Sequence, residues 1–182
     1  EGILLVLNPL EPEVPFTKIV PQVHQETSLQ DVTHVSVHPI TGQIFMAADS
    51  TGHLRVYKCS SGVSSAFQGM PLNDLSVHHS ASIEGLGFHP LGNLSASAGM
   101  DGKLVIYDST FAPRHVINIK NLFANEDEDE EEDKESDGFT VMKWLGSMAN
   151  GSSLPSSLSF GLLVGTARGR LIILEGRSGL PL

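Results

Sequence analysis

The chain has 182 residues, of which 40% are hydrophobic, and a net charge of −10 at neutral pH. This length supports a domain with a substantial core, and no stretch reaches the roughly 18 apolar residues of a membrane-spanning helix. The charge is local, because residues 126–137 alone carry a net −9. The remainder is nearly neutral, so the sequence lacks the basic footprint of a nucleic-acid groove.

A single cysteine, Cys59, excludes an internal disulfide framework and suits a reducing compartment. We therefore expect an intracellular protein, cytoplasmic or nuclear, without a membrane span or direct contact with nucleic acid. The sequence begins with Glu1 rather than Met, so we also expect it to be part of a longer protein.

A seven-residue phrase occurs four times along the chain, starting at Gly2, Gly52, Gly102 and Gly169. Each copy reads glycine, any residue, leucine, any residue, Val or Ile, Tyr or Leu, and a polar residue. The first three glycines are 50 residues apart, and the fourth follows after 67. A period of this size is typical of an architecture that places copies of one small unit side by side.

The segments before each phrase repeat as well. Residues 32–39 and 83–90 each predict a strand that ends at a proline, and a glycine turn and a second strand follow. A less regular fourth strand is expected at 65–69 and at 115–119, and the third unit has strands at 139–144 and 160–166. Four strands per 50 residues, with tight turns and no helix, predict the blades of an all-β propeller.

The units resemble the WD-repeat family of β-propellers. Tyr107 and Asp108 stand at the family's Trp-Asp position, Asp101 precedes the turn glycine, and His79 lies where the family has its Gly-His histidine. The resemblance implies a buried structural network of His79, Ser97, Asp101 and Tyr107. The other units depart from the pattern, with Thr51 or Arg168 in place of Asp101.

The predicted organisation is one incomplete propeller segment of about three and a half blades. Residues 1–30 would be the third and fourth strands of a preceding blade and a link, 31–81 and 82–125 two blades, and 126–138 an acidic disordered loop. Residues 139–182 would be the first three strands of another blade, interrupted by a Ser-rich solvent loop at 146–159. Because closed propellers usually have about four to eight blades, we expect the remaining blades on the same longer chain.

No motif predicts catalysis, a cofactor or a metal site. Gly99–Lys103 resembles a phosphate loop only partly, because Ser97 replaces its first glycine and Leu104 its final Ser or Thr. His38 and His89 occupy the same position before a proline, so we interpret them as turn residues rather than ligands. We expect no enzymatic activity.

The sequence therefore predicts a non-catalytic scaffold that mediates protein–protein interactions within an intracellular multiprotein complex. The expected partner contacts are residues taken to be exposed in turns: Thr33, His34, Asp49, Ser50, Met100 and Arg168. The first alternative is an adaptor for basic or nucleic-acid-associated proteins, of a nuclear or ribosome-assembly type, that acts through its acidic loop; a propeller enzyme or a lipid binder is the second alternative. The acidic loop is either a solvated surface segment or such a contact, and its core is Glu126, Asp127, Glu128, Asp129, Glu130, Glu131, Glu132 and Asp133.

Overall fold

The computed structural model describes residues 31–59, 69–74, 79–123, 137–146 and 160–182, together with two short strands at 4–6 and 17–19. Of strands 4–6, 17–19 and 69–74 only the backbone pairing is described. The elements, in chain order, are β1 Leu4–Val6, β2 Thr17–Ile19, β3 Val32–Val37, β4 Ile44–Asp49, β5 Leu54–Cys59, β6 Gly69–Asp74, β7 Ile83–Phe88, β8 Ser95–Gly99, β9 Lys103–Tyr107, β10 Pro113–Asn118, α1 Ile119–Leu122, β11 Phe139–Trp144, β12 Gly161–Thr166 and β13 Leu171–Glu175.

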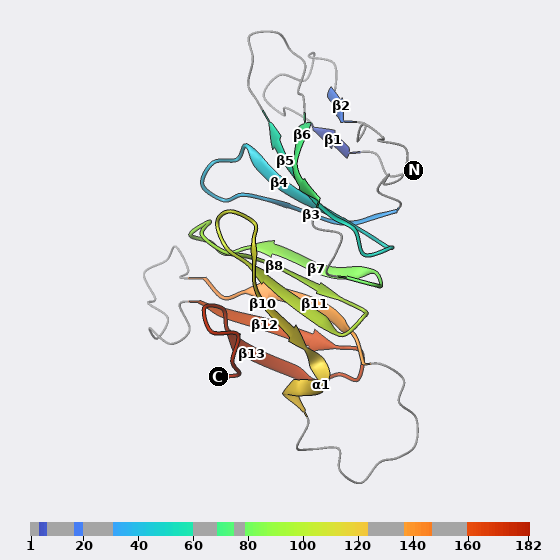
Figure 1. Ribbon diagram of the computed structural model, residues 1–182, viewed down its shortest axis with the longest axis vertical. Coiled ribbons are helices and arrows are strands. Elements are labelled where there is room, and N and C mark those ends of the chain that lie inside the picture. The colour runs from blue at the N-terminus through green and yellow to red at the C-terminus, as the bar shows by residue number, and fades with distance from the viewer. Residues whose placement is uncertain are drawn as a thin grey trace.

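These strands form small antiparallel sheets in which chain order is also spatial order. The sheets are β3-β4-β5-β6, β7-β8-β9-β10 and β11-β12-β13, and β1 pairs with β2 separately. We call the three larger sheets the first, second and third blades; they stack face to face along the long axis of the molecule (Figure 1). The first strands of adjacent blades pack against each other: β7 of the second blade contacts β3 of the first blade and β11 of the third. This is the arrangement of propeller blades around an axis.

The same irregularity marks the first strand of every blade. The register shifts between Val32 and His34 in β3, at the equivalent place in β7, and again between Phe139 and Val141 in β11. At a bulge, two residues of one strand lie opposite one residue of the partner strand, so the alternation of side chains between the two faces of the sheet shifts at this point. It also sets a common register, so that positions in the three blades can be compared directly.

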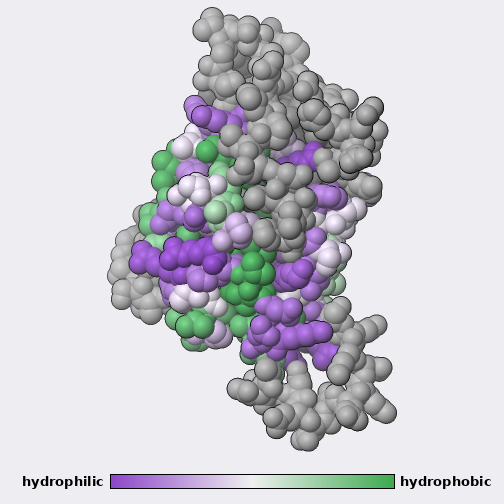
Figure 2. Space-filling view, viewed as in Figure 1, coloured by the Kyte–Doolittle hydropathy of each residue, from purple (hydrophilic) through white to green (hydrophobic). Residues whose placement is uncertain are grey.

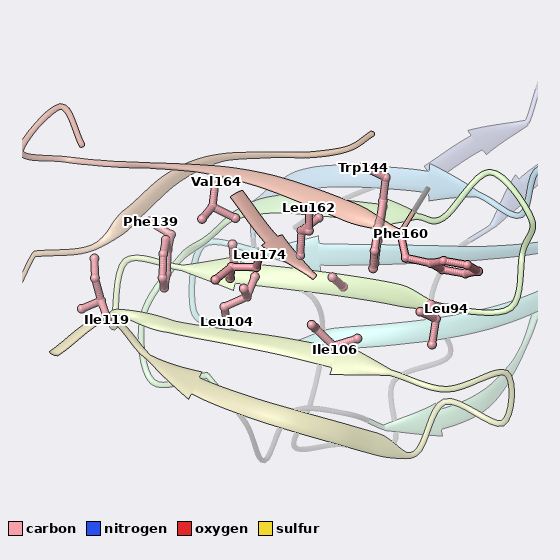
Figure 3. Close-up of a cluster of buried hydrophobic side chains, with 12 residues drawn as sticks. Leu94, Leu104, Ile106, Ile119, Phe139, Trp144, Phe160, Leu162, Val164 and Leu174 are labelled. Atoms are coloured by element: carbon pink, nitrogen blue, oxygen red, sulfur yellow. The ribbon is translucent and has the colours of Figure 1, made fainter. Parts of the chain in front are cut away.

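Apolar side chains fill both seams between the blades. Met46, Leu54 and Val56 of the first blade belong to one cluster with Ile83 and Tyr107 of the second. The second seam holds a larger cluster (Figure 3), in which side chains of the second blade meet those of the third. Strands buried on two faces read as nearly continuous apolar runs, and all five residues of β8 are buried.

The fourth strands differ from their predicted positions. In the first blade the fourth strand is Gly69–Asp74, so it begins where the predicted segment at 65–69 ends. In the second blade it is Pro113–Asn118, and helix α1 follows at once. The expectation of a unit without helix is wrong at this point, because the side chain of Asn118 accepts a hydrogen bond from the backbone N–H of Lys120 and caps one helical turn.

Most of the acidic loop predicted at 126–138 lies outside the described residues. Residues 124–136 lie outside the described residues, as do residues 147–159 of the Ser-rich loop. The last two residues of the predicted acidic loop, Asp137 and Gly138, are described and lie at the start of the third blade. The backbone N–H of Arg168 donates to Asp137 Oδ1 at 3.1 Å, and that of Ala167 donates to the Gly138 carbonyl at 2.9 Å.

The third blade also has the start of a fourth strand, which the sequence did not predict. The Leu182 N–H donates to the Ile173 carbonyl at 2.9 Å, and the Glu175 N–H donates to that of Leu180 at 2.8 Å. Residues 180–182 therefore run beside β13. Within the described residues, no helix is both long and apolar enough to cross a membrane.

Candidate functional site

A chain of hydrogen bonds joins four buried polar side chains of the second blade. His79 Nε2 lies 2.7 Å from Ser97 Oγ, which in turn lies 3.1 Å from Tyr107 Oη. On its other side, His79 Nδ1 lies 3.1 Å from Asp101 Oδ1. The structure thus brings together His79, Ser97, Asp101 and Tyr107, which come from the segment before β7, from β8, from the following turn and from β9.

The order of donors follows from the chemistry of these groups. Ionised Asp101 only accepts, so Nδ1 of His79 carries a proton and, in the neutral imidazole, Nε2 is an acceptor. Ser97 then donates to His79, and the Tyr107 hydroxyl donates to Ser97. Serine, histidine and aspartate are connected here as in a hydrolase triad, but Ser97 is fully buried and its oxygen is shared with Tyr107. No substrate reaches that oxygen in this arrangement, so we interpret the network as structural.

Burial and hydrogen bonding shift two pKa values in the network. Burial raises the pKa of Tyr107 to about 12, and the nearby Asp101 charge acts in the same direction, whereas the bond to Ser97 opposes the shift. For Asp101, burial favours the protonated form, but hydrogen bonds from the Ser80 N–H, from His79 and from the Lys103 N–H together outweigh it and lower its pKa. The ionised carboxylate of Asp101 is therefore the form that the folded blade stabilises.

The turn that precedes the third strand is closed in the same way in all three blades. Its glycines have positive φ, 93° at Gly52, 72° at Gly102 and 78° at Gly169, a backbone conformation that other residues rarely adopt. We call the end of the molecule that carries these turns, Asp49–His53, Gly99–Lys103 and Thr166–Arg170, the glycine-turn end.

A different side chain in each blade accepts the N–H of the residue after the glycine. Asp101 Oδ1 accepts from Lys103 at 3.0 Å, and Asp49 Oδ1 accepts from His53 at 2.9 Å. In the third blade the hydroxyl of Thr166 accepts from Arg170 at 3.3 Å. Sequence reasoning missed Asp49 and Thr166 in this role, because they lie two residues before the position that Asp101 occupies.

Comparison with known proteins identifies the architecture. No family model and no curated protein matches the chain. Sqt1 from Chaetomium thermophilum superposes with a TM-score of 0.61 at 19% identity, over 86% of this chain and 34% of Sqt1. The same protein bound to the N-terminus of ribosomal protein L10 gives 0.60 at 20% identity, over 83% and 33%. The C-terminal WD40 domain of Sif2 gives 0.59 at 14% identity, over 84% and 36%.

The chain has the fold of WD40 propeller blades. It spans only about a third of the length of the solved structures that it matches, and its described sheets do not close into a ring. The prediction of an incomplete propeller of antiparallel blades, resembling the WD-repeat family, is confirmed. At identities of 14–20% the likeness establishes the fold and nothing finer.

Three of the expected partner contacts lie at the glycine-turn end of the WD40 blades. Ser50 and Met100 are half-buried in the turns after β4 and β8, and Arg168 is exposed in the turn after β12. Helix α1 lies at the same end, because the Ile119 N–H donates to the Gly102 carbonyl at 2.8 Å. Figure 2 shows hydrophilic side chains gathered over this helix.

The other three expected contacts are placed differently. Asp49 is fully buried, where its carboxylate accepts hydrogen bonds from the turn that follows it. Thr33 and His34 belong to strand β3 rather than to a turn, and both reach the second blade. Thr33 Oγ1 donates to the Ile83 carbonyl at 2.7 Å, and His34 Nδ1 lies 3.3 Å from the same oxygen. Thr33 and His34 therefore link the first two blades, and Asp49 closes its own turn.

The two histidines that precede prolines also bridge blades. His38 Nε2 lies 3.0 Å from the Gly92 carbonyl of the second blade, and its Nδ1 accepts the N–H groups of its own turn at 3.3 Å. His89 stacks on Phe160 of the third blade, 4.6 Å between ring centroids, and meets the edge of Trp144. The interpretation of His38 and His89 as turn residues is therefore incomplete, because both also contact the neighbouring blade. Within the described residues no group of three His, Cys, Asp or Glu could hold a metal ion.

Proposed function

We propose that these blades are part of a non-catalytic scaffold that binds other proteins within an intracellular complex. The proposal rests on one observation: the serine, histidine and aspartate side chains that could take part in catalysis make structural contacts within and between the blades. Ser97, His79 and Asp101 form one buried network, and Asp49, His38 and His89 form turns and seams. What the described blades offer to a partner is a surface of turn residues.

The glycine-turn end is the surface that we assign to the partner. Ser50, Met100 and Arg168 lie there in equivalent turns of three successive blades, so a partner that spans them would contact all three. Folds of this kind are solved in complexes: Sqt1 is bound to the N-terminus of ribosomal protein L10, and another neighbour, with a TM-score of 0.54, is part of a mitotic checkpoint complex. These facts support the proposal by analogy of fold.

The second candidate is an adaptor for basic or nucleic-acid-associated proteins that acts through the acidic tract. Its specific support is where the tract is attached. Before the tract, the guanidinium of Arg170 lies 4.2 Å from the ring centroid of Phe123, and after it Asp137 accepts the Arg168 N–H. Both attachment points are at the glycine-turn end, so a segment with a net charge near −9 begins and ends beside the assigned surface. Such a tract would speed the approach of a basic partner.

The test compares three variants of the protein in affinity capture at low and at high salt, with the captured proteins identified by mass spectrometry. The first variant, Met100→Arg with Arg168→Glu, alters the glycine-turn end. The matched control, Ile40→Arg with Leu91→Arg, alters two exposed residues in the turns of the opposite end. The third variant replaces every acid in residues 126–136 by its amide and keeps Asp137, which is packed against the third blade.

Each outcome separates the candidates. The scaffold predicts one set of captured proteins that survives high salt and the neutral tract but is lost with the first variant. The adaptor predicts a set of basic proteins that is lost in high salt and with the neutral tract. Loss with the Ile40 and Leu91 variant alone would contradict the assigned surface, and a set that no variant alters would contradict both proposals.

A further inference from the structure

Four basic side chains gather around helix α1 at the glycine-turn end. Lys103 begins β9, which pairs with the strand that leads into the helix, and Lys120 is exposed on the helix itself. The Arg170 guanidinium lies 4.2 Å from the ring centroid of Phe123, the C-terminal cap of the helix. Arg168 is exposed in the same turn as Arg170. We call these residues the basic cluster: Lys103, Lys120, Arg168 and Arg170.

The basic cluster has more cations than carboxylates. Among the described residues, the helix, the second and third glycine turns and the segment before β11 hold two carboxylates, those of Asp101 and Asp137. Lys103 Nζ lies 3.8 Å from Asp101 Oδ2, but that carboxylate also accepts backbone N–H groups of its own turn and of the segment before β7. Asp137 Oδ1 accepts the Arg168 N–H. Four cations therefore stand beside two carboxylates that already close the turns, which makes this a surface that attracts anions.

The cluster is specific to the second and third blades. At the positions of Lys103 and Arg170 the first blade has His53, and at the position of Arg168 it has Thr51. The other exposed cations of the described blades, Lys58, Arg114, Lys143 and Arg177, lie toward the opposite end. The basic surface is thus confined to the part of the glycine-turn end where the acidic tract is attached.

The two ends of the acidic tract meet beside this surface. Residues 124–136 join the helix to Asp137, and they hold nine acids and one lysine, a net charge of −8. A Cβ added at Gly102 would lie 2.9 Å from Ile119 Cγ2 of the helix and 2.9 Å from the Asp137 carbonyl oxygen, so the chain leaves and re-enters the blades at nearly the same place. A segment of this length with both ends at one place extends no farther than about 25 Å from it, since the chain spans at most about 3.6 Å per residue.

This attachment favours contact between the tract and the cluster. A single exposed ion pair contributes little, and a free acidic peptide would also lose translational and rotational freedom on binding. Both ends of the tract are already fixed, so its binding is intramolecular, with an effective concentration on the order of mM. Several weak pairs can then act together against a surface of opposite charge.

We propose that the basic cluster is a binding site for an acidic peptide segment and that its occupant is the acidic tract of the same chain. Carboxylates of residues 126–135 would pair with Lys103, Lys120 and Arg168 beside the seam between the second and third blades. Charge complementarity and the shared attachment point support this occupant, because an acidic segment of a partner would have to compete with a tethered one. One consequence rests on the proposed function: a partner of the glycine-turn end would have to displace the tract, and a basic partner would do so by binding the same carboxylates.

The test is zero-length cross-linking of the full-length protein with a carbodiimide, which joins a carboxylate to a lysine amine that is in contact with it. The linked peptides are identified by mass spectrometry. We expect the tract to be joined to Lys120 and Lys103, whereas the exposed lysines of the opposite end, Lys58 and Lys143, serve as internal controls. The yield should be at least about 10-fold lower in 1 M salt, where the Debye length falls to about 3 Å.

A pair of matched variants separates binding from mere proximity. Arg168→Gln with Arg170→Gln removes half of the charge of the cluster and should lower the yield at Lys120 by about 5-fold. The control, Arg114→Gln with Arg177→Gln, removes the same charge at the opposite end and also takes a guanidinium from an aromatic ring, since that of Arg177 lies 3.6 Å from the ring centroid of Phe160. The control should leave the yield unchanged. Arg168→Gln alone is the second variant if the double variant misfolds.

Three results would overturn the proposal. A yield at Lys120 that neither salt nor the cluster variant changes would mean that the tract is only tethered nearby. Cross-links to Lys58 and Lys143 that are as frequent as those to the cluster would mean that the tract has no preferred site. Cross-links that form only between differently isotope-labelled copies in a mixture would mean that the tract binds a second molecule. The measurement needs no partner, so its failure and that of the proposed scaffold function are distinguishable.

Discussion

Replacing Ser97 by Ala tests whether the buried network stabilises the second blade. Ser97 Oγ lies 2.7 Å from His79 Nε2 and 3.1 Å from Tyr107 Oη, and all three side chains are buried. The substitution removes one hydrogen-bond partner from each of two buried polar groups, which costs about 1–3 kcal/mol per group. It also removes the cost of burying the serine hydroxyl, which offsets part of this loss. The free energy of unfolding should therefore fall by about 2–4 kcal/mol, a large part of the about 5–15 kcal/mol of a typical domain.

Ser95→Ala is the matched control, because Ser95 is on the same strand and equally buried. Among the described residues its hydroxyl has no hydrogen-bond partner, so removing it should leave stability unchanged or raise it by about 1 kcal/mol. Urea unfolding is followed by the fluorescence of Trp144, the one tryptophan of the chain, whose Nε1 donates to the Gly87 carbonyl across a seam. The midpoint should fall by about 1–2 M for Ser97→Ala only. Equal midpoints for the two variants would refute the reasoning.

Three further predictions concern pH and the turns. The pKa of Asp101 is lowered in the folded state, so its stabilising contribution is present above the ordinary value of 3.8 and is lost as pH falls through the lower folded-state pKa. Asp101→Asn should therefore flatten the decline in unfolding free energy between about pH 4 and pH 2, and an unchanged slope would contradict this. In a Tyr57→Phe variant, the phenolate absorbance of Tyr107 should titrate with a midpoint near pH 12 when folded, against 10.0 for the ordinary group; a folded-state midpoint near the ordinary value would show that the phenol is not buried. Gly52→Ala should lower the free energy of unfolding more than Gly169→Ala. Both glycines have positive φ, so each substitution costs about 1–2 kcal/mol of backbone strain, but of the two only Gly52 would place a Cβ 2.8 Å from a backbone oxygen. Equal urea midpoints would mean that the structure relaxes to remove this close approach.

The resemblance to a known family predicted the polar network that the structure assembles, but not every residue that does the same work. Asp101 was placed by the resemblance, because it stands at the family's position directly before the turn glycine. Asp49 and Thr166 close the same turn from the end of the preceding strand. Their role depends on where the strand ends and on which rotamer points inward, and neither can be read from spacing.

The expected partner contacts show more clearly that the sequence does not predict which side chains face a neighbouring blade. Thr33 and His34 lie at the start of the strand predicted at 32–39 and were expected to be exposed, yet both make contacts to the second blade. A residue on the first strand of a blade faces a neighbour that is 50 residues away in the chain. The register shift in β3 decides which side chains face it, and that shift appears only when the strands are paired.

The sequence by itself determined the blade: its strands, its turn glycines and the antiparallel order all follow from a period and from residues that act locally, because glycine adopts the positive φ of these turns at little cost. The tertiary structure alone decided what each copy of that blade does. Three copies of one phrase place their leucines identically, but Leu54 and Leu104 are covered by the next blade, whereas Leu171 is not. Whether a side chain is buried depends on what packs against it, and the seven-residue phrase does not specify what packs against its blade.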